Sequence, residues 1–243
     1  MERIFGTAKL SIVTGDLTNS PDLDLIVNAA NEQLRGGGGV CGFIFKAAGW
    51  KGMQYACNGH LADISGVRCP TGESISTPAG ELPNKGVVHS VGPRFNQQLE
   101  DDCLDDSYMN QMRDELDAAY TSALDEAARL GFASIGFPAI SCGIFKYPTD
   151  VAAEVAATAC RAWMIANSGS TVQEVRLVFI PFADGPALQD LAEAAVLALP
   201  SEPHTVVNAP ISDGLVNAAL LQAGIVPASM QDGSGGIIQS CDD

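Results

Sequence analysis

The sequence predicts an α/β protein with three layers, in which helices cover both faces of a largely parallel sheet. Two observations predict this fold class. Short apolar runs of strand type alternate along the chain with longer segments whose apolar residues recur at helical spacing. This alternation is typical of parallel strands joined by crossover helices. A chain of 243 residues, of which 47% are hydrophobic, also contains enough apolar surface for a large core.

Each element is expected where its own pattern is found. Clusters of branched apolar residues predict buried strands at 10–13, 25–27, 86–91, 133–137 and 175–180. Helices are expected at 40–48, 108–130, 149–166 and 185–199. The helix at 108–130 has apolar residues at a spacing close to 3.6, so it is amphipathic. Pro138 ends the strand at 133–137, and Thr149 is a suitable cap for the helix at 149–166.

The charge balance limits the class of partner. Asp and Glu number 29 against 13 Lys and Arg, and the net charge is −16. Such a chain repels polyanions at long range, so we expect no nucleic-acid partner. No apolar run is long enough to span a bilayer, and the first residues lack the layout of a signal peptide. We therefore expect an intracellular protein, cytoplasmic or nuclear, with no membrane partner and a monomeric state.

The seven cysteines are odd in number and scattered along the chain, so we expect reduced thiols. Cys57, His60 and Cys69 have the spacing C-x2-H-x8-C, which could supply three zinc ligands. No CxxC pair accompanies them, and zinc requires a fourth ligand or an organised open position. The prediction is therefore that the chain has no metal site.

Two regions differ from the rest in composition. Residues 99–117 are rich in Asp and Glu, which predicts a solvated insertion, with an interaction surface as the alternative. Residues 201–243 contain no Lys or Arg. We expect a folded domain over residues 1–199 and a C-terminal tail over residues 200–243 that is low in complexity or loosely docked.

The most informative segment is the run of four glycines at 36–39, between a predicted strand and a predicted helix. Glycine loses more conformational entropy on folding than any other residue, so an ordered run indicates that something approaches the backbone closely. Glycines can adopt positive φ and expose N–H groups, and a nest of these donors at a helix start suits a phosphate or diphosphate. A flexible linker is the alternative. With a net charge of −16, backbone donors rather than a basic surface are the expected means of holding the anion.

A second glycine-bearing loop, residues 138–148, also lies between a strand and a helix, and the two loops could hold a diphosphate from opposite sides. The motifs Gly-Asp-Leu, Val-Asn-Ala-Ala-Asn, Cys-Pro-Thr-Gly-Glu and Val-His-Ser-Val-Gly-Pro begin at residues 15, 27, 69 and 88. With these motifs, residues 8–199 resemble the macrodomain family, and most of all its MacroD-type branch of O-acetyl-ADP-ribose deacetylases and mono-ADP-ribosyl-protein hydrolases. The resemblance implies a three-layer α/β/α macrodomain with a mixed, largely parallel central sheet.

The resemblance also implies a set of ligand contacts. Asp16 would accept a hydrogen bond from the adenine amino group, and Asn31 would contact the distal ribose near its anomeric carbon. Phe145 would pack on the distal ribose and Phe182 near the adenine, while backbone N–H groups of both loops would hold the diphosphate. The implied ligand-binding residues are Gly15, Asp16, Leu17, Ala29, Ala30, Asn31, Gly36, Gly37, Gly38, Gly39, Val40, Cys41, Ser141, Cys142, Gly143, Ile144, Phe145, Lys146, Tyr147 and Phe182.

Several of these residues have a structural alternative. Asp16 could cap a turn, and Asn31 could close an Asx turn. Phe145 and Phe182 could belong to the core. His89 lies within a predicted strand, so we expect it to be a structural histidine rather than a base.

Cys41 departs from the family pattern, in which the glycines and Val are followed by an Asp that is proposed to activate or orient the attacking water. A positioned general base contributes roughly 10²–10⁴-fold to a rate. Without it, the diphosphate and Asn31 could orient the water, or a Cys41 thiolate could be the base, although a nearby diphosphate would raise its pKa. Binding without turnover is the third outcome. Phe45 also stands where the family usually has a histidine.

The function implied is hydrolysis of an ester at the distal ribose of ADP-ribose, on mono-ADP-ribosylated Asp or Glu side chains of proteins and on O-acetyl-ADP-ribose. The candidate catalytic residues are Asn31, Cys41, Gly143 and Phe145. A non-catalytic ADP-ribose reader and an ADP-ribose 1″-phosphate phosphatase are the alternatives. The resemblance implies no cofactor.

Overall fold

Seven strands form one mixed sheet within residues 1–95, 106–180 and 185–200, which are the residues that the computed structural model describes. The strands are β1 (Glu2–Phe5), β2 (Ala8–Thr14), β3 (Leu25–Ala29), β4 (Ser74–Pro78), β5 (Gly86–Ser90), β6 (Ser134–Phe137) and β7 (Glu174–Phe179). Their order is β1-β2-β7-β6-β3-β5-β4. The inner strands run parallel, while β1 and β4 pair antiparallel at the two edges. The predicted mixed, largely parallel sheet is confirmed.

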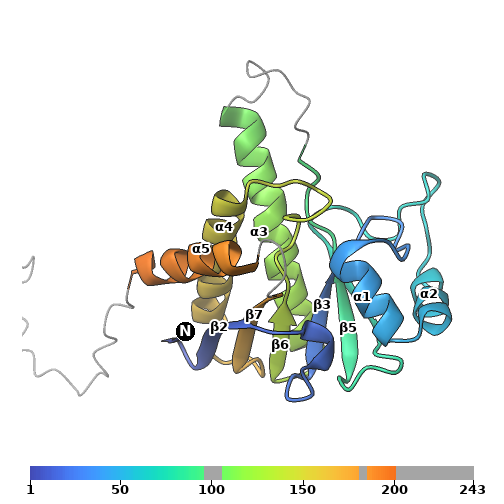
Figure 1. Cartoon of the computed structure of the whole chain (residues 1–243), viewed down its shortest axis with the longest axis horizontal. Helices are drawn as coiled ribbons and strands as arrows, with labels where there is room; N and C mark the ends of the chain where they lie inside the picture. The colour runs from blue at the N-terminus through green and yellow to red at the C-terminus, as the bar shows by residue number, and fades with distance from the viewer. Residues whose placement is uncertain (96–105, 181–184, 201–243) are drawn as a thin grey trace, which may run out of the picture. The chain divides into compact units, whose positions relative to one another are not determined.

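Helices lie on both sides of this sheet (Figure 1). The helices are α1 (Gly39–Ala47), α2 (Trp50–Asn58), α3 (Asp106–Arg129), α4 (Thr149–Ala166) and α5 (Gly185–Ala198). Helices α3 and α4 contribute to one buried apolar cluster, with Leu116, Tyr120 and Trp163 among its members. Helices α1 and α2 contribute to the other, which includes Ile44 and Met53. The three-layer α/β/α architecture is therefore confirmed.

The structure adds three elements that the sequence patterns did not predict: β1, β4 and α2. Strands β1 and β4 are edge strands with mixed burial, so they lack the continuous apolar run of the inner strands. Helix α2 is only nine residues long and buries Met53 and Cys57, too few for a clear helical period. The helix predicted at 40–48 begins and ends one residue earlier, and the one at 149–166 has the predicted bounds.

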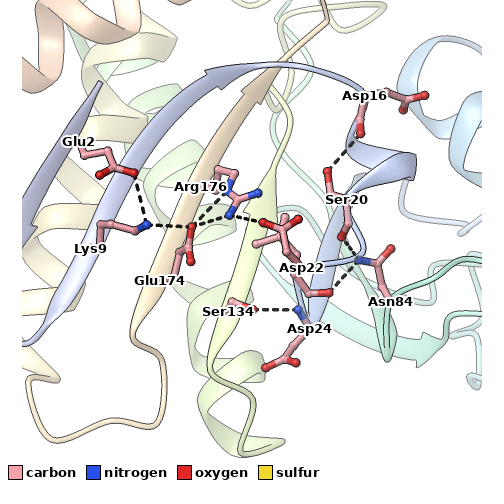
Figure 2. Close-up of polar contacts among 11 residues, drawn as sticks. Glu2, Lys9, Asp16, Ser20, Asp22, Asp24, Asn84, Ser134, Glu174 and Arg176 are labelled. Atoms are coloured by element: carbon pink, nitrogen blue, oxygen red, sulfur yellow. Dashed lines mark hydrogen bonds and ion pairs between the residues drawn. The ribbon is translucent and has the colours of Figure 1, made fainter.

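A series of ion pairs links the β1–β2–β7 edge of the sheet to the segment that precedes β3 (Figure 2). Lys9 lies 3.3 Å from Glu2 and 3.5 Å from Glu174. Arg176 lies 2.6 Å from the same Glu174 and 2.7 Å from Asp22. These contacts hold the connection between β2 and β3 against the sheet.

Hydrogen bonds also fix the same connection (Figure 2). The Asn84 amide donates to the carbonyl oxygens of Ser20 at 2.9 Å and Leu23 at 2.8 Å. The N–H of Asp24 donates to Ser134 Oγ at 2.8 Å. Strand β3, which leads into the glycine run, therefore starts from a fixed position.

Residues 96–105, 181–184 and 201–243 lie outside the described residues. They include Phe182, much of the acidic 99–117 segment and nearly all of the predicted tail, so the predictions for these parts stay predictions. The compact unit that contains the described residues runs from Met1 to Pro200. Among the described helices, none combines the length and the apolar character needed to cross a bilayer.

Candidate ligand-binding site

A cavity of about 320 Å³ opens at the carboxyl ends of three neighbouring parallel strands, β6, β3 and β5. In parallel sheets this edge is where ligands bind. The cavity is lined by three segments, one following each strand: Ala29, Ala30, Asn31, Gln33, Arg35, Gly37, Gly38, Gly39, Val40 and Cys41 after β3; Gly92 and Arg94 after β5; and Ala139, Ile140, Ser141, Gly143, Ile144 and Phe145 after β6.

Gly36 has a packing role and does not line the cavity. A Cβ at this position would lie 2.7 Å from ring atoms of both Phe45 and Trp50. Its N–H donates to Gln54 Oε1 at 2.9 Å. The N–H that the sequence analysis assigned to the diphosphate is therefore bonded in this structure to α2, and it attaches the loop to that helix.

The next glycines keep the cavity open and let the two loops meet. A Cβ on Gly37 or Gly39 would meet nothing within 4 Å, and Gly39 has a φ of 60°. A Cβ on Gly38 would lie 3.2 Å from Ile144 Cδ1, so the second loop touches the first at this point. A Cβ on Gly42 would lie 2.6 Å from the carbonyl oxygen of Gly37, which shows how closely the loop lies on α1.

Both loops present backbone donors that have no acceptor within the described part of the chain. In the first loop these are the N–H groups of residues 38–41, where α1 begins. The first N–H groups of any helix lack an intrahelical partner, and the helix dipole adds partial positive charge there. In the second loop they are the N–H groups of Ser141, Gly143, Ile144 and Phe145. This arrangement suits an anion held between the loops.

The second loop is strained at both ends. Ser141 and Lys146 have φ values of 66° and 59°, which non-glycine residues adopt at a cost of about 1–3 kcal/mol each. Ser141 is only 5% exposed, lines the cavity, and its hydroxyl has no partner in the described residues. Gly92 lies directly beside it, since a Cβ there would be 2.3 Å from Ser141 Oγ. A strained backbone and an unpaired buried hydroxyl thus occur together on the cavity wall.

Asn31 lines the cavity and also closes a turn. Its side-chain Nδ2 donates to the carbonyl oxygen of Arg35 at 2.7 Å, and its Oδ1 accepts the Arg35 N–H at 3.1 Å. The structural role that the sequence left open for Asn31 is therefore present. Its second Nδ2 proton and second Oδ1 lone pair are still available to a ligand.

Cys41 is 6% exposed and lies between the cavity and the buried Asn28. The Asn28 Nδ2 atom lies 3.6 Å from Cys41 Sγ. Burial raises the pKa of the Cys41 thiol, more than the contacts with Gly37 and Asn28 lower it. The thiol is therefore protonated at neutral pH and does not accept a proton from water.

His89 is fully buried behind Asn28 and bonded at both ring nitrogens. Nδ1 lies 3.0 Å from Asn28 Nδ2, and Nε2 lies 2.9 Å from Thr77 Oγ1. Because the Asn28 amide donates, Nδ1 accepts and the proton is on Nε2. Burial lowers the pKa of His89 to about 3, so the ring is neutral. His89 has the structural role that its place in a strand predicts.

The family model described as Macro domain matches residues 27–156, more than half of the chain. The chain belongs to the macrodomain family. The O-acetyl-ADP-ribose deacetylase of Escherichia coli K12 is 43% identical over 150 residues, covering 61% of this chain and 76% of the relative. Macro domain-containing protein VPA0103 of Vibrio parahaemolyticus is 40% identical over 152 residues, with coverages of 63% and 81%.

Solved macrodomain structures have the same fold. The Oceanobacillus iheyensis macrodomain with ADP has a TM-score of 0.67 and 31% identity, and the match covers 81% of this chain and 94% of that one. The Trypanosoma brucei macrodomain in complex with ADP-ribose has a TM-score of 0.60 and 28% identity, with coverages of 77% and 68%.

Several residues that the resemblance implied lie outside the cavity lining of this macrodomain. Asp16 Oδ1 accepts hydrogen bonds from the Thr18 N–H at 2.9 Å and from the Thr18 hydroxyl at 2.7 Å. Asp16 is therefore the N-cap of a short 3₁₀ helix, Leu17–Asn19. Leu17 and Tyr147 are buried in the core. The implied residues that do not line the cavity are Gly15, Asp16, Leu17, Gly36, Cys142, Lys146 and Tyr147, and Phe182 is not described.

Other residues line the cavity without having been expected: Gln33, Arg35, Gly92, Arg94, Ala139 and Ile140. Arg35 and Arg94 are the charged members of the described lining, which contains no carboxylate. The Cζ atom of Arg94 lies 4.6 Å from the centroid of the Phe145 ring. Gly92, Ala139 and Ile140 lie in the motif at 88–93 and the loop at 138–148, but no ligand contact was expected of them. Gln33, Arg35 and Arg94 belong to no motif and reach the cavity through the path of the chain after β3 and β5.

Within the described residues, no group of three or more His, Cys, Asp and Glu side chains is arranged to hold a metal ion. Cys57, one of the three residues of the zinc-like spacing, has its Sγ 3.7 Å from His89 Nε2.

Proposed function

We propose that this macrodomain binds ADP-ribose and hydrolyses an ester at its distal ribose. The substrates proposed are proteins mono-ADP-ribosylated on Asp or Glu, and O-acetyl-ADP-ribose. The observation that carries the proposal is a pair of loops that face one cavity with unpaired backbone N–H groups, those of residues 38–41 and of Ser141, Gly143, Ile144 and Phe145. The names of the Escherichia coli and Trypanosoma brucei proteins support the choice of ligand.

The diphosphate is the part of the ligand that fits these donors. Its oxygens would accept hydrogen bonds from the N-terminus of α1 and from the second loop, where charge-assisted bonds are stronger than neutral ones. The Ser141 hydroxyl, buried and without a partner in the described residues, would add one donor. Asp16 keeps its Oδ2 oxygen for the adenine amino group, because the cap of the 3₁₀ helix uses Oδ1.

The distal ribose would then lie between Asn31 and Phe145. A water held by the diphosphate and the Asn31 amide would attack the ester. The rate would come from positioning the water and the reacting carbon, and from fixed N–H dipoles, rather than from a base. Cys41 does not supply the base, because its thiol is protonated at neutral pH.

The reader hypothesis remains the competing one, because the same Cys41 stands where a base is expected. The two hypotheses predict the same ligand and differ only in turnover. They are separated by incubating the protein with a Glu-linked mono-ADP-ribosylated protein, following release of the label, and measuring ADP-ribose binding by calorimetry on the same preparation. We expect slow release together with binding. Binding without detectable release would contradict the hydrolase and support the reader.

A further inference from the structure

Arg94 is held against Phe145 at the cavity wall. Its guanidinium carbon lies 4.6 Å from the centroid of the Phe145 ring. The neighbouring backbone is fixed, because the Phe95 N–H donates to the carbonyl oxygen of Phe145 at 2.9 Å. Gly92 also lies close to the second loop, since a Cβ there would be 2.3 Å from Ser141 Oγ. The segment that contains Arg94 is therefore attached to the second loop through both its backbone and the Arg94 side chain.

The charge of Arg94 is not neutralised within the described residues. Arg94 is exposed, and no carboxylate of residues 1–95, 106–180 or 185–200 lies within ion-pair distance. The net charge of the chain is −16, so most of its cations have acidic residues available as partners, whereas Arg94 at the cavity has none among the described residues. The contact with the ring uses none of the five N–H donors, so a fork that fits a carboxylate remains available.

We propose that Arg94 is the residue that recognises the acyl part of the substrate, by binding the carboxylate that leaves when a glutamyl or aspartyl ester of ADP-ribose is cleaved. This inference rests on the proposed function, in which Phe145 lies against the distal ribose. Arg35 is the other cationic residue of the described lining, and its backbone is bonded to Asn31. Arg94 is the one of the two whose guanidinium lies on the Phe145 ring.

The reaction makes a cation useful at this place. The oxygen of water forms a bond to C1″ of the distal ribose, and the bond between C1″ and the ester oxygen breaks. The electron pair stays on that oxygen, which becomes part of a carboxylate, and the proton of the attacking water passes to solvent. Negative charge thus develops on the acyl group, where a guanidinium stabilises it more in the transition state than in the neutral ester.

The variants Arg94→Met and Arg94→Lys test the proposal, with Arg113→Met as the control. Arg113 pairs with Glu154 between α3 and α4, so its substitution makes the same change in net charge away from the cavity. We expect Arg94→Met to lower kcat/KM for a Glu-linked mono-ADP-ribosylated peptide at least tenfold while the Kd for ADP-ribose changes less than threefold. The kcat/KM of Arg94→Lys should lie between those of the wild type and Arg94→Met. An equal loss in both quantities, or no loss in either, would overturn the inference.

A binding measurement separates this inference from the proposed function. The probe is ADP-ribose that carries an uncleavable carboxymethyl thioether at C1″, which presents a carboxylate without a cleavable ester. The wild type should bind this probe at least fivefold more tightly than ADP-ribose, and Arg94→Met should lose that preference. If the wild type shows no turnover but keeps the preference, the hydrolase proposal fails and Arg94 still recognises the carboxylate. If the preference is absent from the wild type, the inference is wrong whatever the turnover.

Discussion

The side-chain amide of Asn31 is bonded twice to the backbone of Arg35, with distances of 2.7 and 3.1 Å. The residue that would contact the distal ribose therefore also shapes the loop that contains the glycine run. Substitution of Asn31 would remove a ligand contact and loosen the loop at the same time. A measurement of activity alone therefore does not separate the loss of the contact from the loosening of the loop.

We predict that Asn31→Ala lowers turnover at least tenfold and lowers the free energy of unfolding by about 1–3 kcal/mol, from two hydrogen bonds of about 0.5–1.5 kcal/mol each. Urea denaturation measures the second effect. Asn31→Asp keeps the acceptor for the Arg35 N–H but removes the donor to its carbonyl oxygen, so it should lose about half of that stability. Unchanged stability in Asn31→Ala would show that the turn does not depend on this side chain.

Gly42→Ala is expected to weaken ADP-ribose binding at least tenfold without unfolding α1. A Cβ at this position would lie 2.6 Å from the carbonyl oxygen of Gly37, so the first loop must move away from the helix. Calorimetry gives the affinity. Gly52→Ala is the matched control, because Gly52 lies within α2 and a Cβ there would meet nothing within 4 Å. The control should keep its affinity and gain about 0.5–1 kcal/mol in stability from helix propensity.

Cys41→Ala should retain turnover within about threefold, and Cys41→Asp should raise it by at least tenfold. A carboxylate in this position could act as the general base, which contributes about 10²–10⁴-fold. Burial raises the pKa of the Cys41 thiol, so it stays protonated, and the pH–rate profile of the wild type should show no inflection from Cys41 between pH 6 and 8. Loss of activity in Cys41→Ala with intact binding would instead identify the thiol as catalytic.

The stability of the protein should fall as the pH decreases below about 6.5. Burial lowers the pKa of His89 from 6.5 to about 3. Between these values the unfolded chain binds a proton that the folded chain does not, so stability falls with decreasing pH, by up to about 1.4 kcal/mol per pH unit. Between pH 6.5 and 5, His89→Gln should show a smaller slope in urea denaturation. An identical slope would mean that His89 is accessible to protons when folded.

Asp22→Asn should cost less than about 1 kcal/mol at pH 7, because the Asp22 side chain is 60% exposed and its ion pair is screened by solvent. The hydrogen bond from Arg176 lowers the pKa of the Asp22 carboxyl. The ion pair therefore stabilises the fold fully at a pH above the pKa that Asp22 has in the unfolded chain. This stabilisation is lost as the pH falls through the lower pKa that Asp22 has in the folded protein. A double-mutant cycle with Arg176→Met measures the coupling energy, which should decrease in acid. A pH-independent coupling would contradict the ionic origin of the contact.

The sequence predicted the parts of the fold that have a clear pattern and no others. The inner strands and α3, α4 and α5 have continuous apolar runs or helical periods. Strand β4 contains Pro78 and is only partly buried, and α2 begins at Trp50 and is nine residues long. Such elements are ordered by the sheet and the neighbouring helix rather than by their own residues, so no local pattern indicates them.

The sequence singled out the two loops that line the cavity, but not every side chain that lines it. The glycine run and the loop at 138–148 indicated where an anion would bind, because the residues that form a backbone cradle are adjacent in sequence. Arg94 stacks on Phe145, which is 51 positions further along the chain. Gly92 and Ser141 are also far apart in the sequence, although they are close in the structure. The sequence alone does not show that a single glycine such as Gly36 packs under an aromatic pair instead of facing a ligand.

The backbone cradle has a consequence for the surface of this protein. Peptide dipoles act on an anion over a few ångströms, whereas the field of surface carboxylates is screened beyond about 8 Å at physiological ionic strength. The two effects therefore operate over different distances. If the loops hold a diphosphate as proposed, the 29 acidic residues of the chain do not prevent its capture, and substitution of surface charges away from the cavity should leave the affinity nearly unchanged.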